Sequence, residues 1–590
     1  MLKVPMKVSA LTALVLIIAA ALPAAAQQAA TPSEETSGLD QAVEAAIRGI
    51  SARAIEAHVR FLSSDFLEGR GTGQNGGEVA AEYIAAQFKL IGLGAPVPTG
   101  AGSPPSFFQN VPLVGVETVI DQTVAAFIND EETYTPKFLE QAVYWTESQA
   151  EMAEASGEVV FVGYGAVAPQ WEWDDFKDVD VNGKIVMMLV NDPPSDDPAL
   201  FGGKALTYYG RWTYKLFVAA EKGAAGAILI HDTDMAGYGW DVVRNSWGKE
   251  QAFNPIDPQG TPPLKLAAWI TRETAAKVVQ MGGQDLTALM EQAKSREFRP
   301  VTLTGVEMAA RITSKVRPIN VRNVAAFYPG QDPAKNSEFV IYTAHYDHLG
   351  KIDVPAGEDG IFNGARDNAS GVAALIEIAR TYTRRSIKPR RSLLFIATAA
   401  EEQGLRGSRH FTDRRNLFIY PARLAANVNV DGISPDGETT DYELLGADRS
   451  PQLTSIAKTA AEHLSFTVVP DAHPEKGSYY RSDHFPFARL GVPAISVHNG
   501  LSARDQPPGW GEEKYQDYLA KRYHQVTDQI DESWNFDGIA TTAGVAWYLG
   551  YLASIEEALP MWNEGDEFAS ERQEALEELA DLAAAPKPAN

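Results

Sequence analysis

Cysteine is absent from the sequence of 590 residues, and basic residues are scarce relative to acidic ones. Without cysteine the chain can form neither a disulfide framework nor a lipid attachment through a thiol. Its 51 lysines and arginines face 77 aspartates and glutamates, so the formal net charge is −26. Proteins that bind nucleic acid need a basic face to neutralise phosphates. We therefore expect no nucleic-acid partner.

The length and composition indicate a folded protein with more than one domain. Hydrophobic residues make up 45% of the chain and charged residues 22%, which is typical of globular proteins. A chain of 590 residues exceeds one ordinary domain and suffices for two or three.

The amino-terminal residues are typical of a secretory signal peptide. Lys3 and Lys7 precede an apolar core over residues 10–21, and Ala24-Ala25-Ala26 forms an A-x-A cleavage site. That core is shorter than the ~20 residues that a membrane span needs, so we expect cleavage after Ala26 and no stable membrane anchor. The sequence thus predicts a secreted or periplasmic protein. Removal of residues 1–26 takes away two positive charges and changes −26 to −28.

Changes in residue pattern along the chain predict its domain boundaries. From Val316 apolar runs alternate with helical patterns, which predicts an α/β fold with a mostly parallel sheet flanked by helices. Short apolar runs separated by turn residues predict an inserted β-rich segment earlier in the chain. The expected segments are an amino-terminal part of the main domain at 27–114, the insert at 115–305, the main domain at 306–565, and an acidic helix with a tail at 566–590.

Potential metal ligands cluster directly after apolar runs in the second half of the chain. The run 339–342 precedes His345 and the run 393–396 precedes Glu401-Glu402, with Asp367 between them. Such runs are typical of buried parallel strands. Open α/β sheets bind ligands just beyond the carboxyl ends of their strands. Imidazoles and carboxylates gathered there indicate a metal site suited to zinc.

Together with Asp431-Gly432 and Tyr523-His524, these clusters resemble the M28 family of metallopeptidases, the dizinc aminopeptidases and their relatives. The resemblance implies the zinc-dependent exopeptidase fold, two zinc ions per chain and peptide substrates. Gly163-Tyr164-Gly165 and the run beginning at Ala219 resemble the protease-associated (PA) domain that many secreted members carry as an insert.

By this resemblance the chain has five metal ligands, and Asp367 bridges the two ions. His345 and Asp431 complete one position, and Glu402 and His524 complete the other. For any one of these residues alone, a solvated carboxylate or a core histidine would be the better interpretation. The five in family order and spacing favour the metal site.

Three further residues are assigned to catalysis. Glu401 adjoins a ligand and is the candidate general base, which takes a proton from water and passes it to the leaving amine. Asp347 fits a carboxylate that orients a ligand imidazole, the alternative being an ion pair with an arginine. Tyr523 matches a tyrosine that donates to the oxyanion in many relatives, although it can also simply pack in its aromatic loop.

Several alternatives remain open. Ser482-Asp483-His484 suggests a Ser-His-Asp triad, but neighbours in sequence rarely have triad geometry and no G-x-S-x-G elbow surrounds Ser482. Support of the substrate pocket is the better role for it. Besides an aminopeptidase, the sequence permits a single-zinc acyltransferase of the glutaminyl-cyclase type, a carboxypeptidase, or a non-catalytic binding module of the same fold. It does not determine the preferred substrate residue or the oligomeric state.

Overall fold

The computed structural model describes residues 41–100, 102–385 and 387–584, so the predicted signal peptide at 1–26 lies outside the described residues. The compact unit that contains the candidate site begins at Ala46. None of the helices described in these ranges is both long and apolar enough to cross a membrane.

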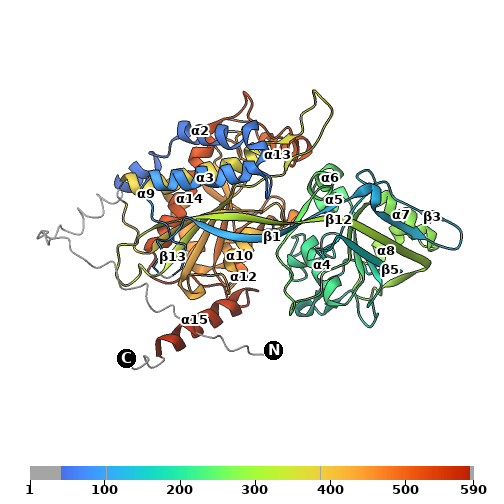
Figure 1. Cartoon of the computed structure of the whole chain (residues 1–590). Coiled ribbons are helices and arrows are strands. Elements are labelled where there is room, and N and C mark those ends of the chain that lie inside the picture. Colours follow the sequence, from blue (N-terminus) through green and yellow to red (C-terminus); the bar gives the residue numbers. More distant parts are fainter. Residues whose placement is uncertain (1–40, 101, 386, 585–590) are drawn as a thin grey trace, which may run out of the picture. The chain divides into compact units, whose positions relative to one another are not determined.

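A mixed, mostly parallel sheet runs through this unit (Figure 1). Its first strands in spatial order are β19 (Thr467–Val469), β18 (Asp441–Leu445), β20 (Ala494–Asn499), β17 (Leu424–Val430), β13 (Phe339–His345), β16 (Ser392–Thr398) and β12 (Val301–Tyr328). The order continues through β5 (Met152–Phe161), β8 (Ile185–Leu189), β9 (Gly226–His231), β11 (Leu266–Thr271) and β4 (Ala142–Trp145). The neighbours β16, β13, β17 and β20 are parallel, which confirms the predicted fold class.

Helices accompany this sheet throughout. Outside the segment 115–305 they are α2 (Ala52–Leu62), α3 (Asn75–Leu90), α9 (Gly371–Arg385), α10 (Arg406–Thr412), α11 (Pro451–Leu464), α12 (His484–Arg489), α13 (Trp510–Lys521), α14 (Phe536–Ile555) and α15 (Ala569–Ala584). Inside it they are α4 (Trp212–Glu221), α5 (Thr233–Ala236), α6 (Trp240–Trp247), α7 (Arg272–Met281) and α8 (Leu286–Gln292).

One face of the central strands packs against α9 and α14. Tyr342 of β13 stacks on Phe395 of β16, with ring centroids 5.3 Å apart and an interplanar angle of 6°. Tyr382 of α9 and Trp547 of α14 close over this pair, and their own centroids are 5.3 Å apart. These rings are fully buried, so the aromatic cluster fixes both helices on this face of the sheet.

The opposite face packs against α10 and α12. Ile341, next to Tyr342 in the chain, points to this side because successive side chains of a strand alternate between faces. It packs in one apolar cluster with Phe411 of α10 and Phe487 of α12. Because helices cover both faces of β13, its side chains are apolar on both sides, which explains the continuous apolar run in the sequence.

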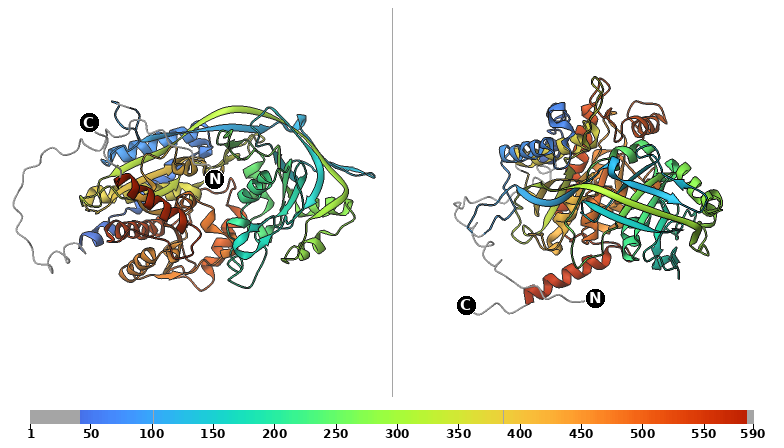
Figure 2. Two further views of the ribbon diagram at one scale, coloured as in Figure 1. Left: turned by 90° about the horizontal axis from the view of Figure 1, so that it is seen from below. Right: turned by 45° about the vertical axis from the view of Figure 1, so that its right-hand side comes forward.

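The strand β12 is 28 residues long and connects the two halves of the sheet. Its residues 324–328 pair with β16, and its residues 301–313 pair with β5. Between them it pairs antiparallel with β1 (Phe108–Thr118), from Ser314 to Val324. Figure 2 shows β12 (yellow-green) running beside β1 (blue).

The segment 115–305 carries its own helix-covered strands. The buried side chains of β8 and β9 alternate between two apolar clusters. The first cluster includes Val278 and Val279 of α7 and Leu289 of α8, and the second includes Leu216 of α4 and Val243 of α6. The segment therefore contains more helix than its short strands and turns predict from sequence.

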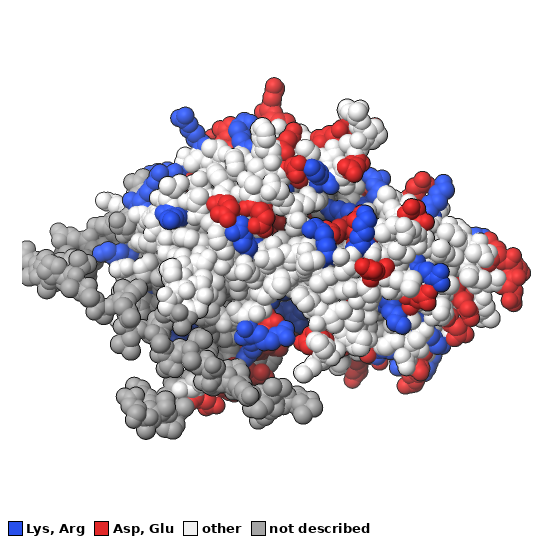
Figure 3. Space-filling model, in the orientation of Figure 1, with Lys and Arg blue, Asp and Glu red and all other residues white. Residues whose placement is uncertain are grey.

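Charges of both signs are mixed on the molecular surface. On the face drawn in Figure 3, lysine and arginine side chains lie interspersed with aspartate and glutamate.

Candidate metal centre

The candidate ligands lie where parallel strands of the sheet end. His345 is the last residue of β13, Asp431 directly follows β17, and Glu402 lies four residues beyond β16. Because β16, β13 and β17 are parallel neighbours, their carboxyl ends lie side by side. The sheet register thus brings together three side chains that are up to 86 residues apart in the chain.

Asp367 reaches the same place from the turn that precedes α9. Gly364 begins this turn with φ +55°, in the left-handed region. A Cβ atom there would lie 2.5 Å from Cγ of His348, so only glycine fits. The carboxylate of Asp528 accepts the backbone N–H groups of Arg366 and Asp367, each at 3.1 Å. Asp528 therefore fixes the turn that presents Asp367.

The five predicted ligands converge in two groups that share Asp367. Nε2 of His345 lies 3.2 Å from Oδ1 of Asp367 and 3.1 Å from Oδ1 of Asp431. Nε2 of His524 lies 3.4 Å from Oδ2 of Asp367 and 3.1 Å from Oε2 of Glu402. Each oxygen of Asp367 thus faces a different histidine.

These separations suit ligands of a common cation. Zinc binds nitrogen and oxygen at about 2.0–2.2 Å in tetrahedral geometry, which places neighbouring ligand atoms about 3.3 Å apart. The donor atoms around Asp367 are separated by 3.1–3.4 Å. The donor set, imidazole nitrogen with carboxylate oxygen, is also the one that zinc accepts.

The electrostatics of the cluster favour positive charge at its centre. Burial alone would lower the pKa of His524, but Glu402 and Asp367 raise that pKa to about 9. Burial likewise disfavours the carboxylate of Asp367, yet its hydrogen bonds to both histidines hold its pKa well below the usual value. Protons on the imidazoles therefore compensate the carboxylates, and a metal ion would replace them.

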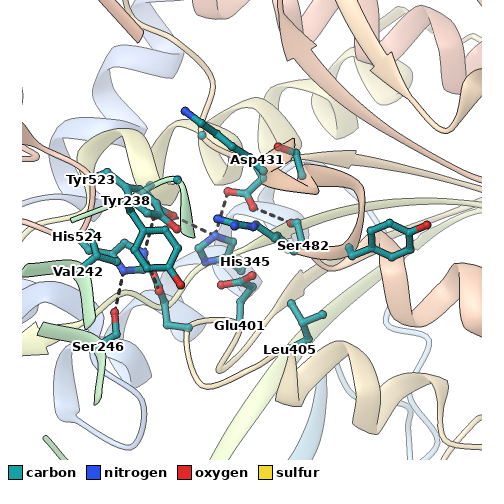
Figure 4. A pocket seen from close by; sticks show the side chains of 18 of the residues that line it. Tyr238, Val242, Ser246, His345, Glu401, Leu405, Asp431, Ser482, Tyr523 and His524 are labelled. Carbon is teal, nitrogen blue, oxygen red and sulfur yellow. Dashed lines mark hydrogen bonds and ion pairs between the residues drawn. The ribbon is translucent and has the colours of Figure 1, made fainter. Parts of the chain in front are cut away.

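Glu401 lies on the wall of a cavity of about 240 Å³ that also exposes the five predicted ligands (Figure 4). Burial raises the pKa of Glu401 well above its ordinary value, and Glu402 and Asp431 add repulsion. One oxygen of its carboxylate, a ring nitrogen of His345 and a carboxylate oxygen of Glu402 lie within 4.8 Å of one another. Glu401 thus lies next to the candidate metal ligands and faces the cavity.

The carboxylate of Asp347 hydrogen bonds to the backbone of Glu401 and Glu402 and lies farther from the ring of His345. It accepts the backbone N–H groups of Glu401 and Glu402 at 3.0 and 3.3 Å. Nδ1 of His345 hydrogen bonds with the backbone carbonyl of Asp347 at 3.1 Å, whereas the carboxylate lies 3.9 Å away. The expected link to the imidazole therefore runs through the main chain, because the carboxylate is turned toward the glutamate-bearing loop.

Tyr523 packs against a predicted ligand on the cavity wall. Its ring centroid lies 4.0 Å from that of His524, with an interplanar angle of 31°. Burial raises the pKa of its phenol, so the group is held protonated and can donate a hydrogen bond.

Two residues near the site were not singled out as ligand partners from the sequence. His348 is fully buried, and its Nδ1 lies 2.7 Å from Oε1 of Glu402. Ser482 donates to Oδ2 of Asp431 at 2.6 Å and accepts from Nδ2 of Asn429 at 2.9 Å. Ser482 therefore supports a predicted ligand. The spacing of His348, three residues after His345, was the available signal for its place.

Residues 323–549 match the model of Peptidase family M28. Over these residues the chain belongs to peptidase family M28. A "Probable zinc metalloprotease" of Pyrenophora teres f. teres (strain 0-1) is 32% identical over 254 residues, which cover 39% of this M28 chain and 49% of that protein. A "Glutamate carboxypeptidase 2 homolog" of Caenorhabditis briggsae is 24% identical over 397 residues, which cover 59% of this chain and 46% of that protein. The M28 chain thus spans less than half the length of these two curated relatives.

A solved structure extends the similarity to the fold of nearly the whole chain. The "Aminopeptidase from Aneurinibacillus sp. strain AM-1" matches with a TM-score of 0.51 and 18% identity. The match covers 89% of this M28 chain and 98% of that one.

Proposed function

We propose that this M28 chain is an exported exopeptidase that binds two zinc ions and releases amino-terminal residues from small peptides. The observation that carries the proposal is the position of Asp367, whose two oxygens face two separate pairs of a histidine and a carboxylate. One carboxylate shared by two such pairs is the arrangement of a two-metal hydrolytic site.

The proposed roles follow from the position of each side chain. His345 and Asp431 would hold one ion, Glu402 and His524 would hold the other, and Asp367 would be shared by both. When bound, the two ions polarise the substrate carbonyl and lower the pKa of water toward neutrality. Glu401 accepts a proton at its carboxylate and passes it to the leaving amine. Tyr523 donates from its phenol to the oxygen on which negative charge develops.

Export rests on the sequence of residues 1–26, which we propose are removed after Ala26. We also propose that residues 115–305 form a PA-like insert that narrows access to the cavity. Arg211, Tyr238 and Ser246 from this segment line the cavity together with the candidate metal ligands. A cavity of about 240 Å³ suits a small peptide and excludes a folded protein.

A carboxypeptidase is the second candidate, because cationic side chains line the same cavity. Arg211, Arg409 and Arg481 lie on its wall. Among the residues that the structure describes, Nε of Arg211 and Nε of Arg481 are buried without a hydrogen-bond partner. A guanidinium group binds carboxylates in a two-pronged geometry, so these groups can receive the carboxyl end of a peptide.

Metal stoichiometry and a substrate panel test the proposal. We expect two zinc ions per chain, loss of activity on chelation, and cleavage of aminoacyl substrates. Faster cleavage of substrates with a free carboxyl terminus would favour the carboxypeptidase. Full activity with one ion would favour the single-zinc acyltransferase, and two bound ions without hydrolysis of either substrate class would favour a binding module.

A further inference from the structure

His524 differs from the other candidate ligands in how the fold holds it. His345 ends a central strand, whereas His524 follows α13 outside any helix or strand. Its φ of +57° lies in the left-handed region, which few residues other than glycine adopt. Contacts from elsewhere must therefore keep this residue in place.

Those contacts come from the last turn of α6, almost 280 residues earlier in the chain. Nδ2 of Asn245 donates to the backbone oxygen of His524 at 2.8 Å. Oγ of Ser246 lies 2.9 Å from Nδ1 of His524. Figure 4 shows Ser246 beneath the His524 ring, with the bond drawn. Ser246 is 4% exposed and His524 is 8% exposed, so water does not replace this pair.

The hydrogen bond of Ser246 selects the tautomer that a metal ligand needs. Nε2 of His524 faces Glu402 and Asp367, so this nitrogen must be free of hydrogen to bind a cation. The ring proton then sits on Nδ1 and donates to Oγ of Ser246. The other candidate histidine obtains its partner locally, from the backbone carbonyl of Asp347 two residues on.

The residues just after Ser246 also contact the other ligand-bearing loops. Nζ of Lys249 donates to the backbone oxygen of Leu349, one residue beyond His348. The backbone N–H of Ala252 donates to Oε1 of Gln403 at 2.8 Å, next to Glu402. Nε2 of Gln251 donates to the backbone oxygen of Ser246 at 2.8 Å, so the residues that make these contacts are also hydrogen bonded to Ser246.

We propose that residues 245–252 are a structural part of the metal centre, with Ser246 as the positioning residue for His524. The inference rests on the proposed two-metal site. In this role the segment 115–305 does more than narrow the cavity, because it sets the affinity of the metal position formed by Glu402 and His524. The other metal position, formed by His345 and Asp431, obtains the partner of its histidine from Asp347, so it should keep its affinity when Ser246 is substituted.

Zinc titration of the metal-free full-length protein against a chromophoric chelator tests the inference. We expect Ser246→Ala to weaken one of the two zinc-binding steps by about 10–100-fold, the usual effect of losing a partner of a ligand histidine. The other step keeps its wild-type affinity. Ser246→Thr restores the hydroxyl and should recover much of the lost affinity.

A double-mutant cycle identifies which step is affected. His524→Ala removes the ligand itself, so adding Ser246→Ala to it should cause no further loss of zinc affinity. Ser246→Ala combined with His345→Ala should weaken both steps, because the two substitutions act on different positions. Should Ser246→Ala not fold, Asn245→Ala carries the same test, since it removes the backbone contact and should weaken the same step.

Two wild-type-like binding steps in Ser246→Ala would overturn the inference. An equal loss in both steps that Ser246→Thr does not recover would also overturn it. Failure of the proposed function looks different: the wild-type protein itself would then bind fewer than two zinc ions.

Discussion

Glu401 and Glu402 are neighbours in sequence with different surroundings in the folded protein. Glu402 has one oxygen 2.7 Å from His348 and the other 3.1 Å from His524. Glu401 faces the cavity. Adjacent carboxylates can therefore serve as a ligand and as a general base, because the loop after β16 turns them toward different partners.

This difference predicts opposite effects of two conservative substitutions. Glu401→Gln should keep both zinc ions and lower kcat by ~10²–10⁴-fold, the usual contribution of a positioned acid–base group. KM should change little, because the lost interaction acts in the transition state. Glu402→Gln removes an anionic ligand and should lower zinc content itself. Metal analysis beside turnover measurements checks both, and the reverse pattern would exchange the two roles.

The sequence predicts which residue types gather at the site better than it predicts their contacts. His345, Asp431 and the glutamates follow apolar runs, and parallel pairing of the strands then brings them together. The contact between Ser246 and His524 carries no comparable signal, because it depends on how two segments 278 residues apart pack. The same holds for Asp528, which acts through the backbone of the turn at Asp367.

At the scale of single elements, α14 shows how closely helices approach the central sheet. A Cβ atom on Gly550 would lie 2.0 Å from Oη of Tyr342. That hydroxyl donates to the backbone oxygen of Trp547 at 3.0 Å, so it cannot move without losing a buried hydrogen bond. Glycine at this position allows the helix to lie directly on β13.

Overpacking a core usually costs about 1–3 kcal/mol, and alanine gains ~1 kcal/mol over glycine inside a helix. Because the contact at Gly550 is very short, we expect Gly550→Ala to destabilise the protein by up to ~2 kcal/mol net. Chemical denaturation measures the difference. The matched control is Gly544→Ala, where the nearest atom to the new Cβ is Cγ2 of Ile47 at 3.2 Å, on a side chain that can shift. Equal stability of the two variants would contradict the argument.

The helix α2 contains a histidine that should make stability depend on pH. Nδ1 of His58 lies 2.8 Å from the hydroxyl of Tyr83, and Nε2 lies 3.7 Å from Glu377. Burial, with Arg380 nearby, lowers the pKa of His58 from 6.5 to about 4. Between these values the unfolded chain binds a proton that the folded chain does not. The contribution of His58 is therefore complete above pH 6.5 and is lost as the pH falls toward 4.

Between pH 7 and pH 5 the free energy of unfolding should fall by about 1–2 kcal/mol more in the wild type than in His58→Gln. Metal ligands and other carboxylates titrate in both proteins, so the difference isolates His58. Denaturation at several pH values measures it. Parallel pH profiles of the two proteins would show that His58 does not contribute.

The central strands match their sequence pattern closely, whereas elements with mixed exposure do not. The apolar run at 339–342 lies within β13 (339–345), and the run at 393–396 lies within β16 (392–398). In contrast, β12 begins at Val301, ahead of the residues at which the alternation of apolar runs and helical patterns starts in the sequence. The first part of β12 alternates buried and exposed residues, so no continuous apolar run marks it.

At the scale of the whole molecule, the proposed metal centre should contribute to stability as well as to the proposed catalysis. The cluster joins the ends of three strands to the turn at Asp367 and to the loop at His524. Without bound ions, only protons on the imidazoles would compensate the buried carboxylates. Ligand held at 100 times its dissociation constant stabilises a protein by about 2.7 kcal/mol.

We therefore expect chelation to lower the Tm and re-addition of zinc to restore it. Calorimetry in the presence of a chelator, followed by titration with zinc, measures the shift. The variant Glu402→Gln serves as the control, because its Tm should respond less to the chelator. An unchanged Tm on chelation of the wild type would mean that the site does not stabilise the fold.

The fold class could be predicted from the sequence, but the extent of the shared sheet could not. Alternating apolar runs and helical patterns indicate an α/β domain, and the insert appears as a change of pattern at about residue 115. The pairing of β12 with strands on both sides joins those two patterns in one sheet. Pairing depends on contacts between distant segments, which local residue patterns do not encode.

The pairing of β1 with β12 also has a consequence for the order in which the chain acquires its structure. During synthesis the hydrogen-bonding edge of β1, residues 108–118, is made about two hundred residues before its partner, residues 314–324. Contacts of such long separation form slowly, and unpaired strand edges attract other chains in the meantime. A nascent chain that stalls between these points would expose an aggregation-prone edge, so folding yield should depend on chaperones that shield it.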